Sequence, residues 1–99
     1  MGYRIELSPE AGDHIAGLSA RDRAIVLDAI GEQLAHEPSL PTRNRKPLRP
    51  NPVAQYRLRA GNLRVYYDVE ETPRALVIVK AVGIKIRERV YVGGREIEL

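Results

Sequence analysis

Basic side chains alternate with apolar ones in three stretches of the chain, YRLRA, NLRVY and IKIRERVY. Alternation is the period of a β-strand, whose successive side chains point to opposite faces of a sheet. One face is therefore expected to carry a row of cations and a phenol. Guanidinium and ammonium groups hold phosphate oxygens through charge-assisted hydrogen bonds. The residues concerned are Arg57, Arg59, Arg64, Lys85, Arg87, Arg89 and Tyr91.

Such a surface is also compatible with the cleavage of RNA. A ribose 2′-hydroxyl attacks its own phosphodiester when a base takes its proton, cations stabilise the phosphorane and an acid protonates the leaving oxygen. The two histidines, His14 and His36, fall on expected helices away from the basic stretches, where we interpret them as surface or packing residues. Lys, Arg and Tyr would have to serve instead, and a dense cationic cluster lowers the pKa of a neighbouring Tyr or Lys.

The charge along the chain is uneven, although the net charge is only +3. Residues 1–37 hold seven acids and three bases, residues 38–67 hold seven bases and no acid, and residues 68–99 hold six of each. A wholly basic middle third is the electrostatic footprint of a protein that binds a polyanion. A solvated basic face is the alternative, and it stays open. The loop bases are Arg43, Arg45, Lys46 and Arg49.

The N-terminal third predicts one strand and two helices. Residues 3–7 alternate between apolar and charged side chains, as a half-buried strand does. Ser8 and Pro9 are an N-cap and a first helical residue, and Ser19 caps a second helix over about residues 20–36. The apolar stripe of that helix is Val26, Leu27, Ile30 and Leu34.

The rest of the chain predicts a proline-rich basic loop and four strands. The prolines of residues 38–52 argue against regular structure there. Strands are expected over 54–59, 63–69, 76–82 and 85–92, and Gly61-Asn62 is a tight turn. In the last strand we expect Lys85, Arg87, Arg89 and Tyr91 on one face and Ile84, Ile86, Val90 and Val92 on the other. Residues 93–99 are left without an assignment.

These elements predict one α+β domain over residues 1–99, with two N-terminal helices on one side of a twisted antiparallel sheet. There is no cysteine, which excludes disulfides and thiol catalysis and suits a reducing compartment. No apolar run is long enough for a membrane span, and no signal peptide pattern opens the chain, so we expect a cytoplasmic protein. No nucleotide-binding or zinc-protease motif is present, and we expect neither a cofactor nor a metal.

The ordered set of motifs resembles the RelE/ParE superfamily of bacterial type II toxins. The pieces are YRIELSPEA, a helical hairpin, KPLR, YRLRAGNLRVYYDV and IVKAVGIKIRERVY, and they cover roughly residues 3–92. The resemblance implies the fold described above. Its RelE branch implies a ribosome-dependent endoribonuclease that cuts mRNA through 2′-hydroxyl attack without a metal.

The resemblance also implies roles for single residues. Arg64 matches the arginine that contacts the scissile phosphate, and Arg57 matches a position that usually holds a catalytic lysine. Lys85 matches an arginine that stabilises or protonates the leaving oxygen. Tyr91 matches a tyrosine that assists 2′-hydroxyl activation and stacks on a base. The binding set that we expect is Arg43, Arg45, Lys46, Arg49, Gln55, Arg59, Arg87 and Arg89.

Two departures from the family pattern bear on the rate of such a reaction. Gln55 stands where well-characterised members have another lysine, and lysine and arginine are exchanged at positions 57 and 85. Arginine does not readily lose a proton, so Arg57 can only stabilise charge. Two alternatives remain open: a ParE-like inhibitor of DNA gyrase that is not an enzyme, and a nuclease-inactive homologue that only binds an antitoxin.

The implied partners are a cognate antitoxin, in a hetero-oligomer, and the 70S ribosome with its mRNA. The antitoxin's identity, the codon preference and the oligomeric state do not follow from the sequence. For Arg87 and Arg89, an alternative to a role in binding is solvation or pairing with the acids Glu88, Glu96 or Glu98.

Overall fold

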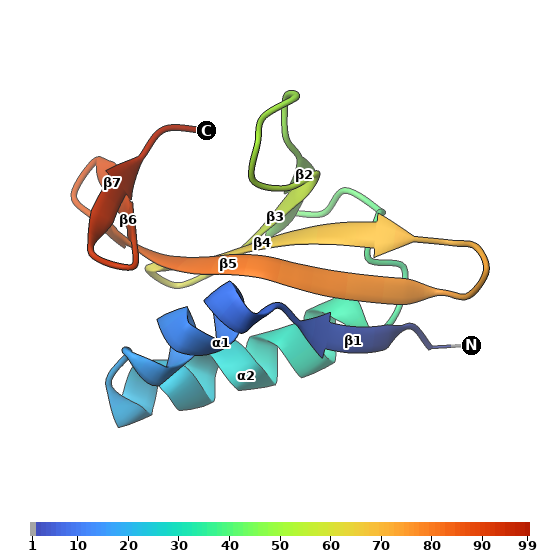
Figure 1. Cartoon of the computed structure of the whole chain (residues 1–99), viewed down its shortest axis with the longest axis horizontal. Coiled ribbons are helices and arrows are strands. Elements are labelled where there is room, and N and C mark those ends of the chain that lie inside the picture. The colour runs from blue at the N-terminus through green and yellow to red at the C-terminus, as the bar shows by residue number, and fades with distance from the viewer. Residues whose placement is uncertain (1) are drawn as a thin grey trace.

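The computed structural model describes residues 2–99 as one sheet with two helices on one face (Figure 1). Residues 93–99, which the sequence left without an assignment, form a turn and a strand. The elements in chain order are β1 (Arg4–Leu7), α1 (Pro9–Ala16), α2 (Ala20–Leu34), β2 (Arg45–Pro47), β3 (Tyr56–Ala60), β4 (Leu63–Glu70), β5 (Leu76–Ile86), β6 (Arg89–Val92) and β7 (Arg95–Ile97).

The sheet has the order β2-β3-β4-β5-β6-β7, and β1 joins it beside β5. All neighbours along that path are antiparallel. The β1–β5 pair is parallel, which the sequence pattern had not indicated. β5 is long enough to hold two partners on one edge, β1 along its first half and β6 along its last residues. The expected fold of two N-terminal helices on a twisted sheet is confirmed.

Each helix begins at a serine whose side chain accepts a hydrogen bond from a backbone N–H group of the first helical turn. The Ala11 N–H donates to Ser8 Oγ at 3.0 Å, and the Asp22 N–H donates to Ser19 Oγ at 3.1 Å. Each bond satisfies one of the free N–H groups of a first helical turn, which is worth about 1 kcal/mol. The N-caps predicted at Ser8 and Ser19 are therefore confirmed.

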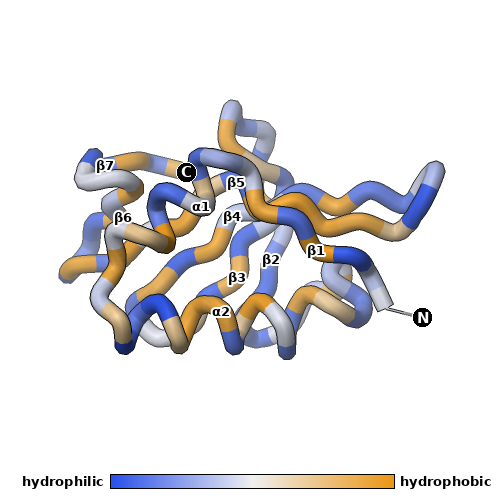
Figure 2. The backbone as a smooth tube through the Cα atoms, turned by 60° about the horizontal axis from the view of Figure 1, so that its bottom comes forward, coloured by the Kyte–Doolittle hydropathy of each residue, from blue (hydrophilic) through white to orange (hydrophobic). Residues whose placement is uncertain are grey.

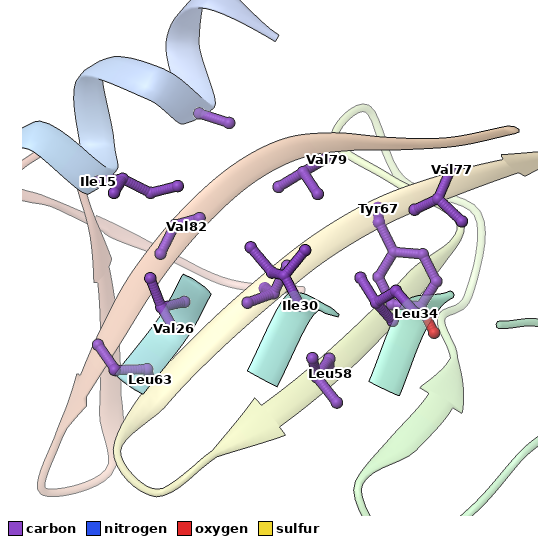
Figure 3. Packing of buried hydrophobic residues seen from close by; sticks show 12 residues of the cluster. Ile15, Val26, Ile30, Leu34, Leu58, Leu63, Tyr67, Val77, Val79 and Val82 are labelled. Carbon is purple, nitrogen blue, oxygen red and sulfur yellow. The ribbon is translucent and has the colours of Figure 1, made fainter. Parts of the chain in front are cut away.

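The main core lies between the helices and the near face of the sheet (Figure 3). Val26, Ile30 and Leu34 of α2 face Leu58 of β3 and Val65 of β4, and the α2 residues are no more than 5% exposed. Along β3 and β4, hydrophobic and hydrophilic residues alternate (Figure 2), so the opposite face of the same strands is free for charged residues.

Two expectations about the helical region and its following loop are wrong. Leu27 is 46% exposed, because it lies one residue outside the stripe that faces the sheet. The proline-rich segment contains a strand, β2, which pairs with β3. β2 is an edge strand of three residues that ends on Pro47, and an edge is where a strand tolerates proline.

The expected strand over residues 85–92 is also wrong, because the chain reverses direction within it. β5 continues to Ile86, Arg87 and Glu88 form a turn, and β6 returns antiparallel. Arg87 has a φ of 58°, a left-handed conformation that few residues other than glycine adopt. A two-residue turn places Lys85 beside Val90 and Ile84 beside Tyr91, so the faces of the returning strand are exchanged relative to one continuous strand.

The two ends of the sheet turn away from the helices (Figure 1). The β6–β7 hairpin rises on one side and β2 with its following loop rises on the other. Gly83 allows the first of these bends: a Cβ there would lie 2.7 Å from the Tyr91 carbonyl oxygen and 2.8 Å from Val92 Cγ2. The far face of the sheet is therefore concave. No helix among residues 2–99 is long and apolar enough to cross a membrane.

Candidate functional site

Six basic side chains lie on the concave face, opposite the helices, and we call them the cationic face: Lys46, Arg57, Arg59, Arg64, Lys85 and Arg87. The strand register brings them together. Lys46 is the cross-strand partner of Arg57, and Arg59 is the partner of Arg64. Partners on one face have Cβ atoms about 5 Å apart, so four of these cations lie in two adjacent rows.

Two hollows divide the cationic face between them, and Arg64 lines both. The wider is an open groove of about 690 Å³ whose basic residues are Arg59, Arg64, Lys85 and Arg87. The smaller, of about 100 Å³, contains Lys46, Arg57 and Arg64. Of the described residues, no aspartate or glutamate lines either hollow. This uncompensated charge attracts a polyanion.

Arg64 is fixed by the turn that precedes its strand. Its Nη1 donates hydrogen bonds to the carbonyl oxygens of Gly61 at 2.8 Å and Leu63 at 3.0 Å. The residue is only 7% exposed. Burial lowers the pKa of Arg64, and the neighbouring charge of Arg57 lowers it further. The guanidinium is still a cation at any physiological pH. The two hydrogen bonds of Nη1 hold it in one orientation, and neither of them uses Nη2 or Nε.

Arg57 and Tyr66 lie side by side in the smaller hollow. They are direct cross-strand partners on β3 and β4. Burial lowers the pKa of Arg57, and its buried Nε has no hydrogen-bond partner within residues 2–99. An unpaired buried donor is costly, so the Arg57 side chain lowers the stability of the folded protein at this point. Tyr66 is 2% exposed, and it lies on the same face of the sheet as Arg64.

The apolar residues that cover the smaller hollow were not foreseen from the sequence. Leu48 stands on one side of it, and Val90, Ile97 and Leu99 stand on the other. The tail had no periodic pattern long enough to predict β7, and only the reversal at Arg87 brings Val90 to this face. The signal that could have revealed the reversal, a glycine or asparagine turn pair, is absent.

Some of the expected binding residues lie away from the cationic face. Arg45 is 8% exposed and points to the helix side, where its Nη1 donates to the Gln33 and His36 carbonyl oxygens near the end of α2. Arg45 is therefore not available to a nucleic acid, and that expectation is wrong. Arg89 pairs with Glu96 at 3.3 Å, which is the alternative that the tail glutamates had raised.

Gln55 and Arg49 line a separate hollow of about 560 Å³ beneath the loop that follows β2. The Gln55 side-chain oxygen accepts a hydrogen bond from the Val69 N–H at 2.9 Å, and the Gln55 backbone N–H donates to Asp68 Oδ1 at 2.8 Å. Gln55 thus ties the start of β3 to β4. Arg43 is exposed, and its carbonyl oxygen accepts a hydrogen bond from Arg59 at 3.4 Å.

Tyr91 is not brought together with Arg64 and Lys85. It pairs with Ile84 and lines an apolar groove on the helix side that also includes His14 and Leu18. The expectation that Tyr91 shares a face with Lys85 is therefore wrong. His14 accepts a hydrogen bond at Nδ1 from the Val82 N–H at 3.2 Å. This bond satisfies a β5 amide that lies between the segments paired with β1 and β6.

No family model matches the chain, and no curated protein matches it either. A solved structure does: one chain of the crystal structure of the toxin–antitoxin complex RelBE2 from Mycobacterium tuberculosis. The TM-score is 0.73 and the sequence identity is 24%, over 86% of this chain and 100% of that chain. The likeness shows that the two share one fold, and the RelE-like fold expected from the sequence is the fold of this protein.

Proposed function

We propose that this protein is the toxin of a type II toxin–antitoxin system and a ribosome-dependent endoribonuclease that cuts mRNA. The observation that supports this most is the cationic face, where the described residues gather six cations and no acid around the fixed guanidinium of Arg64. A second observation that supports it is the fold, which this protein shares with one chain of a toxin–antitoxin complex.

The reaction would be an attack of a 2′-hydroxyl on the adjacent phosphate. The 2′-oxygen–phosphorus bond forms and the phosphorus–5′-oxygen bond breaks, which gives a 2′,3′-cyclic phosphate and a 5′-hydroxyl. Arg64 and Arg57 would bind the phosphate oxygens and stabilise the charge of the phosphorane. Lys85, which unlike arginine can give up a proton, would protonate the 5′-oxygen. The 2′-hydroxyl proton would pass to water, since no side chain of the cationic face is an ordinary base.

An antitoxin and the ribosome would be the partners of this site. A surface of uncompensated cations binds nucleic acids without selectivity, so a cell would need to keep it covered. We propose that the antitoxin does so in a hetero-oligomer, and that the free protein acts on mRNA in the 70S ribosome in the cytoplasm.

Primer extension on an mRNA translated in a cell-free system tests the nuclease activity. The wild type should cut within codons of the translated region only when ribosomes are present. Replacing Arg64 with alanine removes a donor at the phosphorane, so Arg64→Ala should lower the cleavage rate by about 10²-fold or more. Arg4→Ala is the matched control, because Arg4 pairs with Glu6 on β1 at 3.3 Å and does not line the cationic face.

Cleavage by Arg64→Ala at the wild-type rate would refute the assignment of Arg64 to the site. An mRNA left intact by the wild type would refute the nuclease, and a DNA gyrase cleavage assay would then test the ParE-like alternative.

A further inference from the structure

The positions of the tyrosines distinguish one of them from the rest. The chain has five tyrosines. Tyr3, Tyr56 and Tyr67 belong to the main core or pack against it, and Tyr91 lines the groove beside His14. Among these five, Tyr66 alone lies on the side of the sheet that carries the cationic face.

Two arginines flank Tyr66. Arg57 is its direct partner on the neighbouring strand, and Arg64 precedes it by two residues on the same face of β4, so the three side chains line one hollow of about 100 Å³. On the other side its partner is Ala81, and the Tyr66 ring packs with Ala54 and Ala81 in a second apolar cluster. Arg57, whose buried Nε has no hydrogen-bond partner within residues 2–99, is one of the residues that line this hollow.

We propose that Tyr66 works with Arg57 and Arg64 on the phosphate of the bound RNA, and that Tyr91 takes no part. The Tyr66 hydroxyl donates a hydrogen bond to a non-bridging phosphate oxygen, and no bond to the tyrosine is made or broken. This inference rests on the proposed function, because it names a further phosphate-binding group of the same site.

The electrostatic surroundings suit a donor rather than a base. Burial raises the pKa of Tyr66, and the charges of Arg57 and Arg64 lower it by less, so the pKa lies above the ordinary value for tyrosine. The phenol is therefore protonated at neutral pH. A protonated phenol between two guanidinium groups offers a third donor to an oxyanion, and preorganised donors of this kind stabilise charge that develops in a transition state.

Access to Tyr66 requires a small movement of the covering residues. Tyr66 is 2% exposed, and Val90, Ile97 and Leu99 close the hollow from the β6–β7 side. Leu99 lies beyond the end of β7 and is 42% exposed. Its side chain can leave the hollow without breaking the strand pairing of β6 with β7, and a phosphate group can then enter beside Tyr66.

Binding of a fluorescently labelled single-stranded RNA oligonucleotide, followed by anisotropy, tests this proposal with a matched pair of variants. Tyr66→Phe keeps the ring and removes only the hydroxyl, and it should weaken binding about tenfold, as expected for a hydrogen bond to a charged group. Tyr91→Phe should bind like the wild type. Both variants should keep the wild-type Tm, since neither removes packing atoms.

Two further readouts separate a phosphate contact from a packing role. In the ribosome assay, Tyr66→Phe should lower the cleavage rate by about 10²-fold. As the pH rises past the raised pKa of Tyr66, the wild type loses the donor and gains a negative charge, so its RNA affinity should fall. The fall should be larger than in Tyr66→Phe, which has no hydroxyl to ionise. If Tyr66 only packs, Tyr66→Phe should have the same cleavage rate and the same pH profile of binding as the wild type.

The outcomes for this proposal and for the nuclease are distinguishable. A wild type that binds RNA but leaves mRNA intact refutes the nuclease, and the anisotropy comparison still decides the role of Tyr66. Equal affinity of Tyr66→Phe and wild type, or a loss confined to Tyr91→Phe, overturns the assignment of Tyr66. A wild type that does not bind the oligonucleotide refutes both.

Discussion

The two faces of this sheet use neighbouring residues for opposite purposes. On the helix side, Leu58 and Val65 are fully buried in a core formed with α2. One residue away on the same strands, Arg57 and Arg64 carry charges that no acid among the residues lining their hollows compensates. The free energy of folding comes mainly from the first face, and the second face accepts like-charge repulsion that only an anionic ligand relieves. Stability and binding can therefore be altered separately by mutating adjacent positions.

The largest difference should appear between Leu58 and Arg57. Leu58→Ala creates a cavity in the main core and should lower the free energy of unfolding by about 2–5 kcal/mol. Arg57→Ala removes a repelled charge and an unpaired buried donor, so stability should be equal to or above that of the wild type. Urea denaturation of both variants measures this, and a loss at Arg57 as large as at Leu58 would contradict the division between the faces.

Tyr67 and Tyr66 form a second neighbouring pair. Burial raises the pKa of Tyr67 to about 12, and its hydroxyl donates to the Pro38 carbonyl oxygen at 2.7 Å. Above pH 10 the unfolded chain ionises at this residue and the folded chain does not, so stability present below pH 10 is lost as the pH rises to about 12. The loss should be about 2–3 kcal/mol.

Denaturation across this pH range should therefore show a slope that Tyr67→Phe reduces. Tyr66→Phe is the control for the contribution of the other buried phenol. If Tyr67→Phe leaves the slope as it is in the wild type, the Tyr67 hydroxyl is not held in the core as described.

Arg45 and Lys46 are adjacent on β2 and point to opposite faces. Arg45→Met leaves the Gln33 and His36 carbonyl oxygens without their donor and should cost about 1–2 kcal/mol of stability, with RNA affinity unchanged. Lys46→Met should weaken RNA binding and leave stability unchanged. Thermal denaturation and RNA anisotropy measure both effects on both variants. If Arg45→Met weakened RNA binding and Lys46→Met lowered stability, the two side chains would point to the opposite faces from those described.

The smallest expected effect is in the salt dependence of RNA binding. Each phosphate contact to single-stranded nucleic acid adds about 0.7 to the slope of log affinity against log salt concentration. Arg59→Ala should reduce the slope by about that amount. Arg89→Ala should leave it unchanged, because Arg89 pairs with Glu96. Equal slopes for both variants would remove Arg59 from the binding surface.

The sequence predicts the elements whose signals are local. Ser8 and Ser19 are caps whose hydrogen bonds form within one helical turn, and the alternation around Leu58 and Val65 follows from two-residue periodicity alone. The convergence of Arg57, Arg59 and Arg64 on one face could be predicted for the same reason, since they lie on adjacent strands joined by a recognisable Gly61-Asn62 turn.

What the sequence does not predict depends on contacts between distant residues. Arg87 adopts a left-handed conformation without a glycine, so the reversal that exchanges Tyr91 for Val90 left no local signal. Arg45 looks like any loop arginine until the end of α2 lies against it. The parallel pairing of β1 with β5 joins segments about seventy residues apart, and no pattern within either segment specifies its partner.

Gly83 has a consequence for how the two faces of the sheet can diverge over evolution. The bend of β6 over β5 exists because position 83 has no side chain, and that bend decides how far the β6–β7 hairpin stands from β2 across the hollow. A residue with a Cβ there would meet the Tyr91 carbonyl oxygen at 2.7 Å, so β6 and the residue that it places over the smaller hollow, Val90, would have to shift. The width of that hollow therefore depends on a glycine that lines the groove on the helix side and not the hollow itself.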